Sequence, residues 1–292
     1  MINFNGLPWL EAAMRSVLAT TEVSIEFVVV DDVSSDASRA AISAAAAVDP
    51  RVKPVFAERN HGLSGARNLG IAAATGHYIS LIDCDDLFLP ETVRMQLAAF
   101  ERLRATEPAL SLLTSDAWLI NERGERKGRY ISPEWWGVEA AGDVPLWTLP
   151  STFFFERGRA AEFFEPYRLS DGPIFVSRMQ KIGPIGFVGE PLIEYRLRMS
   201  SVTNRRGAEV LRQMKAADAS RKADRLDSPF LPDEVPEPDA REVAAWIHGR
   251  NAKNAALNGR VLTAGTETLR AALADPGKTF RKILRAASSL GR

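Results

Sequence analysis

The chain has 292 residues, of which 46% are hydrophobic and 25% are charged, with 37 basic residues balancing 37 acidic ones. This is ordinary globular composition, and a net charge of zero gives no reason to expect a nucleic-acid partner. A single cysteine excludes an intrachain disulfide, and three scattered histidines count against a zinc enzyme. We find no signal-peptide pattern and no run near the ~20 apolar residues of a membrane span, so we expect a cytoplasmic protein.

The first third of the chain alternates short apolar runs with amphipathic, helix-like stretches. Strands are expected at residues 25–30, 52–56, 78–82 and 110–114, and helices at 8–18, 36–48, 64–74 and 90–104. Strands that alternate with helices of this length indicate a parallel, doubly wound sheet. The sequence therefore predicts an α/β protein.

The middle of the chain is less regular. Residues 130–150 carry four large aromatics among glycines and prolines, namely Tyr130, Trp135, Trp136 and Trp147. They either line a binding loop or form core beneath a long loop. Further strands are expected at 150–155 and 192–195, and an apolar segment at 174–179.

The composition changes near residue 204, and we place a domain boundary there. Residues 1–204 form the α/β domain, and residues 205–292 form a helical C-terminal extension with a Pro-rich linker at 227–239. Within it we expect a charged helix over 207–226 and an αα-hairpin over 239–274. The buried side of this hairpin is expected to consist of Val243, Trp246, Ile247, Leu257, Val261, Leu262, Leu269 and Leu273. The basic, amphipathic stretch 278–292 either lies on an anionic membrane surface or docks on its own protein.

Acidic residues gather where two predicted strands end. Asp31 and Asp32 follow one strand, and Asp83, Asp85 and Asp86 follow another. Carboxylates this close together raise one another's pKa unless a cation shares them. Because the carboxyl ends of parallel strands meet at one edge of a sheet, they predict a metal-assisted site for a phosphorylated ligand. The alternative is an acidic turn that caps the helix near residue 90.

Three segments together resemble a known family. Phe27–Asp36, Asn60–Gly70 and Gly76–Asp86 are similar, in order and spacing, to family 2 inverting glycosyltransferases with the GT-A fold, and the resemblance covers roughly residues 1–204. It implies a Rossmann-like, mostly parallel sheet flanked by helices. It also implies a donor site for a nucleoside-diphosphate sugar of the UDP, GDP or dTDP type.

The resemblance assigns roles to matching positions. Asp31 and Asp32 would bind the nucleotide, with Asp32 accepting a hydrogen bond from the base. Arg67 would approach the base or the diphosphate, as an arginine near a helix start can. Asp83 would contact the ribose or the metal, and Asp85 would ligate Mn²⁺ or Mg²⁺, which neutralises the departing diphosphate.

Inversion needs a general base that takes the proton of the acceptor hydroxyl. Asp171, before Gly172 and Pro173, matches the family's base, although Ser170 stands where the family carries a preceding acid. The alternative role for Asp171 is a helix N-cap.

Two departures from the family pattern stand out. Most of the first strand is missing, and Asn3–Gly6 resembles its last residues. Arg198 stands where the related segment often carries a histidine, and an arginine binds phosphate but cannot ligate a metal. No Gln-x-x-Arg-Trp segment is present, which argues against a processive polysaccharide synthase.

The sequence therefore predicts a metal-dependent, inverting, hexosyltransferase-type enzyme. It would move one sugar to a hydroxyl of a saccharide or lipid-linked acceptor in surface glycan or exopolysaccharide assembly, in the cytoplasm or at the inner membrane face through 278–292. The competing hypothesis is a non-catalytic relative that binds nucleotide sugar or a protein partner. An NAD(P)-dependent oxidoreductase is disfavoured because the dinucleotide fingerprint is absent.

Overall fold

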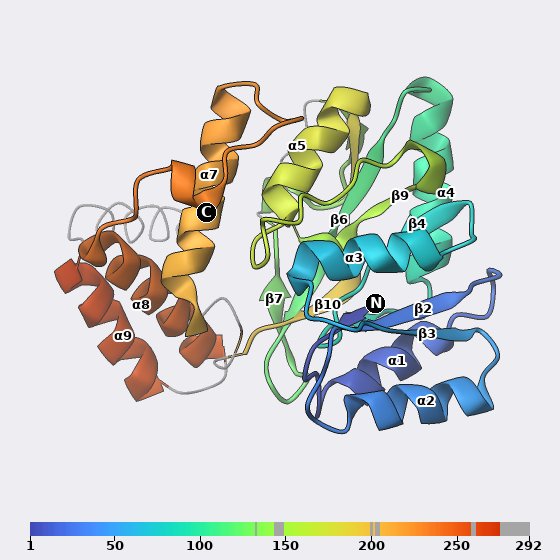
Figure 1. The fold of residues 1–292 in the computed structure, drawn as a ribbon, viewed down its shortest axis with the longest axis horizontal. Coiled ribbons are helices and arrows are strands. Elements are labelled where there is room, and N and C mark those ends of the chain that lie inside the picture. Colours follow the sequence, from blue (N-terminus) through green and yellow to red (C-terminus); the bar gives the residue numbers. More distant parts are fainter. Residues whose placement is uncertain (132, 143–148, 199–200, 202–204, 258–260, 275–292) are drawn as a thin grey trace.

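A computed structural model describes residues 1–131, 133–142, 149–198, 201, 205–257 and 261–274, and it has an α/β body with a helical C-terminal part (Figure 1). The strands are β1 (Ile2–Asn3), β2 (Phe27–Asp31), β3 (Val52–Phe56), β4 (Tyr78–Ser80), β5 (Leu87–Phe88), β6 (Leu112–Ile120), β7 (Arg126–Arg129), β8 (Glu139–Ala141), β9 (Phe154–Glu156) and β10 (Ile185–Arg196). The helices are α1 (Leu10–Leu18), α2 (Ser38–Val48), α3 (Gly62–Ala73), α4 (Thr92–Thr106), α5 (Gly172–Ile182), α7 (Gly207–Lys222), α8 (Ala240–Leu257) and α9 (Val261–Ala274).

The N-terminal sheet has the parallel order β1-β2-β3. Its central strand β2 is a β-branched run, as a strand covered on both faces should be. Val29 packs with residues of α1 and α2 on one face, while Val28 and Val30 pack with residues of α3 on the other. Figure 1 shows α3 on the opposite side of this sheet from α1 and α2.

The larger sheet has the order β4-β9-β6-β10-β5, with β7 paired to β6 and β8 paired to β10. Strands β6 and β10 are parallel, and the other pairings are antiparallel. A single parallel bridge between Ile2 and Asp83 links it to the smaller sheet. The predicted α/β class is confirmed. Parallel pairing is found in the N-terminal sheet and at the centre of the larger one, and antiparallel strands complete the rest.

An aromatic core fills the space beneath α5. Phe163 stacks on Phe175 with ring centroids 3.9 Å apart, and Phe153 and Phe155 contact the same ring. All four rings are buried, and burying a side chain of this size stabilises a fold by about 1.5–3 kcal/mol. This packing fixes the N-terminus of α5, which carries Asp171.

The helical C-terminal part begins with α7, which packs on α5 through Ile174, Ala216 and Ala217. Helices α8 and α9 lie side by side next to α7 (Figure 1), so the predicted αα-hairpin is present. The predicted burial of Leu269 and Leu273 is wrong, because these side chains are 61% and 75% exposed. Among the α9 side chains that the structure describes, the buried ones are those of Glu267 and Ala271.

Two predictions fall on parts of the chain that the structure does not describe. Trp147 and the basic stretch 278–292 lie outside the described residues. Among the helices that are described, we find none with the length and apolar character needed to cross a bilayer.

Candidate active site

The loop that opens α3 is held by Asp32. Its carboxylate accepts hydrogen bonds from the backbone N–H groups of His61 (2.7 Å) and Gly62 (2.8 Å), at the start of the helix. Gly62 has φ +74°, and a Cβ there would lie 2.9 Å from the Cβ of Arg168. Both the backbone conformation and the close approach therefore require glycine. Asp32 thus holds the turn that opens α3, and this turn places Arg67 on the following turn of the helix.

Arg67 joins two of the predicted acids. Its Nη2 donates to Asp83 Oδ1 at 2.7 Å, and its Nη1 forms an ion pair with Asp171 Oδ2. The guanidinium lies 5.5 Å from the centroid of the Phe163 ring, and the side chain is only 2% exposed. Residues far apart in the chain therefore meet at one buried cation.

Burial and charge set the protonation of this group. Burial alone would lower the pKa of Arg67, but the charges of Asp171 and Asp83 outweigh it and raise that pKa. Burial raises the pKa of Asp171, and the opposing effect of Arg67 is smaller. A carboxyl group with a raised pKa is suited to hold a proton taken from a substrate.

A second cluster lies at the turn after β4. Asp85 forms an ion pair with Arg198, and the two side chains are 18% and 20% exposed. Asp86 is fully buried and accepts hydrogen bonds from Ser151 Oγ (2.6 Å) and the backbone N–H of Arg196 (2.9 Å). Burial and the neighbouring charges of Asp85 and Asp83 raise the pKa of Asp86 well above its usual range. The turn is thereby fastened to the end of β10.

Asp31 contacts a different set of residues. Its carboxylate accepts hydrogen bonds from Asn3 Nδ2 (2.8 Å), the Ser34 N–H (3.0 Å) and Arg39 Nε (2.8 Å). These contacts tie β1 and α2 to the end of β2. The structure brings Arg67, Asp83 and Asp171 together, and it does not add Asp31 to that group.

One contributor could not be identified from the sequence. Gln213 of α7 accepts two hydrogen bonds through Oε1, from the backbone N–H groups of Leu169 (2.9 Å) and Ser170 (3.1 Å). It therefore positions the segment that precedes Asp171. Nothing in the local pattern of a charged helix indicates this role, because the two segments are more than 40 residues apart.

We tested whether these residues fit the divalent cation that the family resemblance implies. One oxygen of Asp83 and one of Asp85 already pair with guanidinium groups, and both oxygens of Asp86 accept hydrogen bonds. Mn²⁺ and Mg²⁺ prefer several oxygen ligands. Within the described part of the chain, no group of three or more His, Cys, Asp or Glu side chains is arranged to hold a metal ion. The donor set as arranged does not fit a divalent cation.

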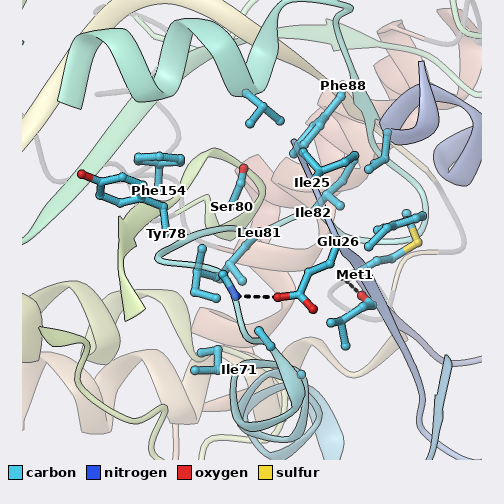
Figure 2. Close-up of a pocket in the computed structure, with 18 of the residues that line it drawn as sticks. Met1, Ile25, Glu26, Ile71, Tyr78, Ser80, Leu81, Ile82, Phe88 and Phe154 are labelled. Atoms are coloured by element: carbon cyan, nitrogen blue, oxygen red, sulfur yellow. Dashed lines mark hydrogen bonds between the residues drawn. The ribbon is translucent and has the colours of Figure 1, made fainter. Parts of the chain in front are cut away.

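A cavity of about 300 Å³ lies between β2 and β4, and Arg67 is among the residues that line it. Figure 2 shows Ile25, Ile82, Phe88 and Phe154 around it. Glu26 at its edge accepts a hydrogen bond from the Gly76 N–H at 2.6 Å. Asp83, Asp85 and Asp171 are not among its lining residues. Such an apolar lining does not suit a diphosphate, so we place the candidate site at the charged groups.

Sequence comparison finds a family match in the N-terminal part of the chain. Residues 1–111 match the profile of glycosyl transferase family 2. Succinoglycan biosynthesis protein ExoO of Rhizobium meliloti (strain 1021) is 43% identical over 123 residues, which is 42% of this chain and 34% of that protein. Putative teichuronic acid biosynthesis glycosyltransferase TuaG of Bacillus subtilis (strain 168) is 30% identical over 95 residues, 32% of this chain and 38% of that protein. The chain spans about a third of these relatives.

Solved structures share the fold over nearly the whole chain. TarS 1-349 of S. aureus superposes with a TM-score of 0.56 at 14% identity, covering 93% of this chain and 89% of that one. Mannosyltransferase PcManGT from Pyrobaculum calidifontis, in complex with GDP-Man and Mn²⁺, gives a TM-score of 0.56 at 16% identity, covering 98% and 78%. At these identities the likeness establishes the GT-A fold alone.

Proposed function

We propose that this chain, whose residues 1–111 match glycosyl transferase family 2, transfers a single sugar with inversion from a nucleoside-diphosphate donor to an acceptor hydroxyl. The observation that carries the proposal is the meeting of Arg67, Asp83 and Asp171 at one buried group. Arg67 and Asp83 lie within residues 1–111, which match the family, whereas Asp171 lies beyond that region.

The donor would bind along the carboxyl ends of β2 and β4. Arg67 would bind the diphosphate, because a guanidinium matches phosphate oxygens in a bidentate geometry. Asp83 is 28% exposed and would accept from a ribose hydroxyl. Two of the solved neighbours support a nucleotide donor, since TarS was crystallised with UDP-GlcNAc and PcManGT with GDP-Man.

The transfer step uses Asp171 as the base. The acceptor oxygen attacks the anomeric carbon, its proton passes to the Asp171 carboxylate, and the bond to the diphosphate breaks with its electron pair on the leaving oxygen. Asp171 pairs with Arg67 in the structure, so the donor phosphates would have to draw the guanidinium away first. Donor binding would thereby release the base, which prevents proton transfer before the donor is in place.

The leaving diphosphate gains one negative charge, which needs a cation nearby. The family resemblance implies that this cation is Mn²⁺ or Mg²⁺ bound by Asp85 and Asp83, and PcManGT was crystallised with Mn²⁺. The arrangement of this chain favours guanidinium groups instead, since both carboxylates pair with arginine.

The acceptor would be a saccharide or lipid-linked hydroxyl in surface glycan or exopolysaccharide assembly. The similarity to ExoO and TuaG, which are named for succinoglycan and teichuronic acid biosynthesis, supports this setting. We place the protein in the cytoplasm or at the inner membrane face, reached through 278–292. Liposome co-sedimentation with and without that stretch tests the membrane contact.

The experiment is incubation with UDP-, GDP- and dTDP-sugars and candidate glycan acceptors, following nucleoside diphosphate release and the anomeric configuration of the product. Asp171→Asn should abolish turnover and keep donor binding. Asp218→Asn is the matched control, because Asp218 is an exposed acid whose ion pairs in the described part of the chain are with Arg221 and Lys222 of α7. Donor binding without turnover in the wild type would favour a non-catalytic nucleotide-sugar binder, and turnover intact in Asp171→Asn would remove Asp171 as the base.

A further inference from the structure

We propose, on the basis of the proposed function, that Arg198 stabilises the departing diphosphate in place of a divalent cation, and that the reaction is metal-independent. Arg198 lies two residues beyond β10 and pairs with Asp85, the residue to which the family resemblance assigns the metal. Its side chain is 20% exposed, whereas that of Arg67 is 2% exposed. A ligand can therefore reach Arg198 without breaking a buried pair.

The fold holds Arg198 beside the turn after β4. The backbone N–H of Arg196 donates to Asp86, and Arg196 Nε donates to the backbone oxygen of Asp85 at 2.9 Å. The Arg196 guanidinium also lies 4.6 Å from the centroid of the Trp9 ring. These contacts fix the end of β10 against the turn and thereby place Arg198 beside Asp85.

The chemistry of the pair suits an anion and opposes a metal. A guanidinium carries five N–H donors in a planar fork, so it can pair with Asp85 and bind phosphate oxygens at once. It has no lone pair for a metal, and its positive charge opposes that of a cation sharing Asp85. Asp85 is then a positioning residue that orients Arg198.

In the transfer step, the bond from the anomeric carbon to the diphosphate oxygen breaks and its electron pair stays on that oxygen. Arg198 donates hydrogen bonds to the diphosphate, loses no proton, and offsets the negative charge that the leaving group gains. The product is the neutral glycoside linkage, the free nucleoside diphosphate, and a proton held by Asp171.

The test compares binding of UDP, GDP and dTDP by calorimetry in EDTA and in Mn²⁺, with the matching nucleosides alongside. For the nucleotide that binds best, we expect the wild-type affinities in EDTA and Mn²⁺ to agree within about threefold. Arg198→Ala should weaken the binding of the nucleoside diphosphate by about tenfold or more and leave the binding of the nucleoside unchanged. Arg198→Lys should recover part of the loss. Arg126→Ala is the control, because Arg126 is an exposed arginine that pairs with Glu194 of β10.

Catalysis gives an independent measurement. Nucleoside diphosphate release in EDTA should match that in Mn²⁺, and Arg198→Ala should lower kcat by about 10²–10³-fold, the range found on removing one transition-state donor. Wild-type binding that EDTA abolishes and Mn²⁺ restores would overturn the metal-free role, and it would leave the proposed function standing. Absence of nucleoside diphosphate binding under both conditions would overturn both proposals. The EDTA comparison uses the unaltered chain, so it holds even where Arg198→Ala does not fold.

Discussion

Replacing Arg67 should cause a large loss of stability, because this residue is the centre of a group of ion pairs. Arg67→Met keeps an apolar stem over the Phe163 ring but removes the cation between Asp83 and Asp171. Asp171 is 3% exposed, and leaving a buried charge without its partner costs about 3–5 kcal/mol. Asp83 is 28% exposed, so its lost pair adds only about 0–1 kcal/mol. We expect the free energy of unfolding to fall by about 3–5 kcal/mol.

Urea unfolding of Arg67→Met, Asp171→Asn and the double variant measures this directly. Because the amide of Asn carries no charge, the double variant should recover much of the loss, with a coupling energy of about 2–3 kcal/mol. Arg102→Met is the control, since Arg102 forms a two-bond pair with Glu139 but is 60% exposed, and it should cost about 0–1 kcal/mol. Equal losses for Arg67→Met and Arg102→Met, or additive effects in the cycle, would refute the reasoning.

Three further variants test the surroundings of the site. Gln213→Ala should lower kcat and leave the KM for the donor nearly unchanged, because it frees the segment before Asp171 while the donor contacts stay in place. Steady-state kinetics measures both constants, and a change in KM alone would contradict this. Gly62→Ala should destabilise by about 1–2 kcal/mol in urea, since Ala at φ +74° is strained, whereas Gly158→Ala, with open space around it, should not. The raised pKa of Asp86 means that the folded state holds this proton more tightly than the unfolded one, so its contribution is full at low pH and lost as pH rises. The stability of the wild type minus that of Asp86→Asn should therefore fall from about pH 4 upward, and a difference that rises with pH would oppose this account.

Much of the fold follows from periodicity in the sequence. Strand β3 has the predicted bounds, and β2, α2 and α4 lie within two or three residues of theirs. The acids at the end of β2 and in the turn after β4 were predicted from their positions alone, because the end of a strand is a local sequence pattern. The contact between Arg67 and Asp83 joins two sheets, because α3 packs on the N-terminal sheet and Asp83 follows β4 of the larger one, whereas the sequence predicted the acids at one edge of a single sheet.

Other features depend on contacts that no local pattern reveals. Strand β10 starts at Ile185, seven residues before the predicted strand, because Gly189 and Pro191 resemble a turn. Gly189 is there because a Cβ would lie 2.0 Å from the Trp135 backbone oxygen. The pairing of Asp85 with Arg198 and the capping of the 169–170 backbone by Gln213 join residues more than 40 positions apart, so only the folded chain shows them.

The aromatics of the middle segment divide between the two alternatives. Trp135 packs edge-on against Phe187, and Tyr130 packs edge-on against Tyr195, so both are half-buried and pack against the core. Trp136 is 48% exposed, with the Arg129 guanidinium 4.7 Å from its ring centroid. Composition alone cannot separate these cases, because the same residue types serve packing and stacking on a sugar.

The contact from Gln213 has a consequence for how such chains can be recombined. The helix that carries it lies in the C-terminal part, so the predicted division at residue 204 separates Asp171 from the residue that orders the backbone just before it. A chimera that keeps residues 1–204 and takes a foreign C-terminal part would keep the donor-binding residues in place. It would lose the alignment of Asp171, the residue that acts on the acceptor. The helical part would be exchangeable between relatives only where α7 still presents a carbonyl oxygen at that position.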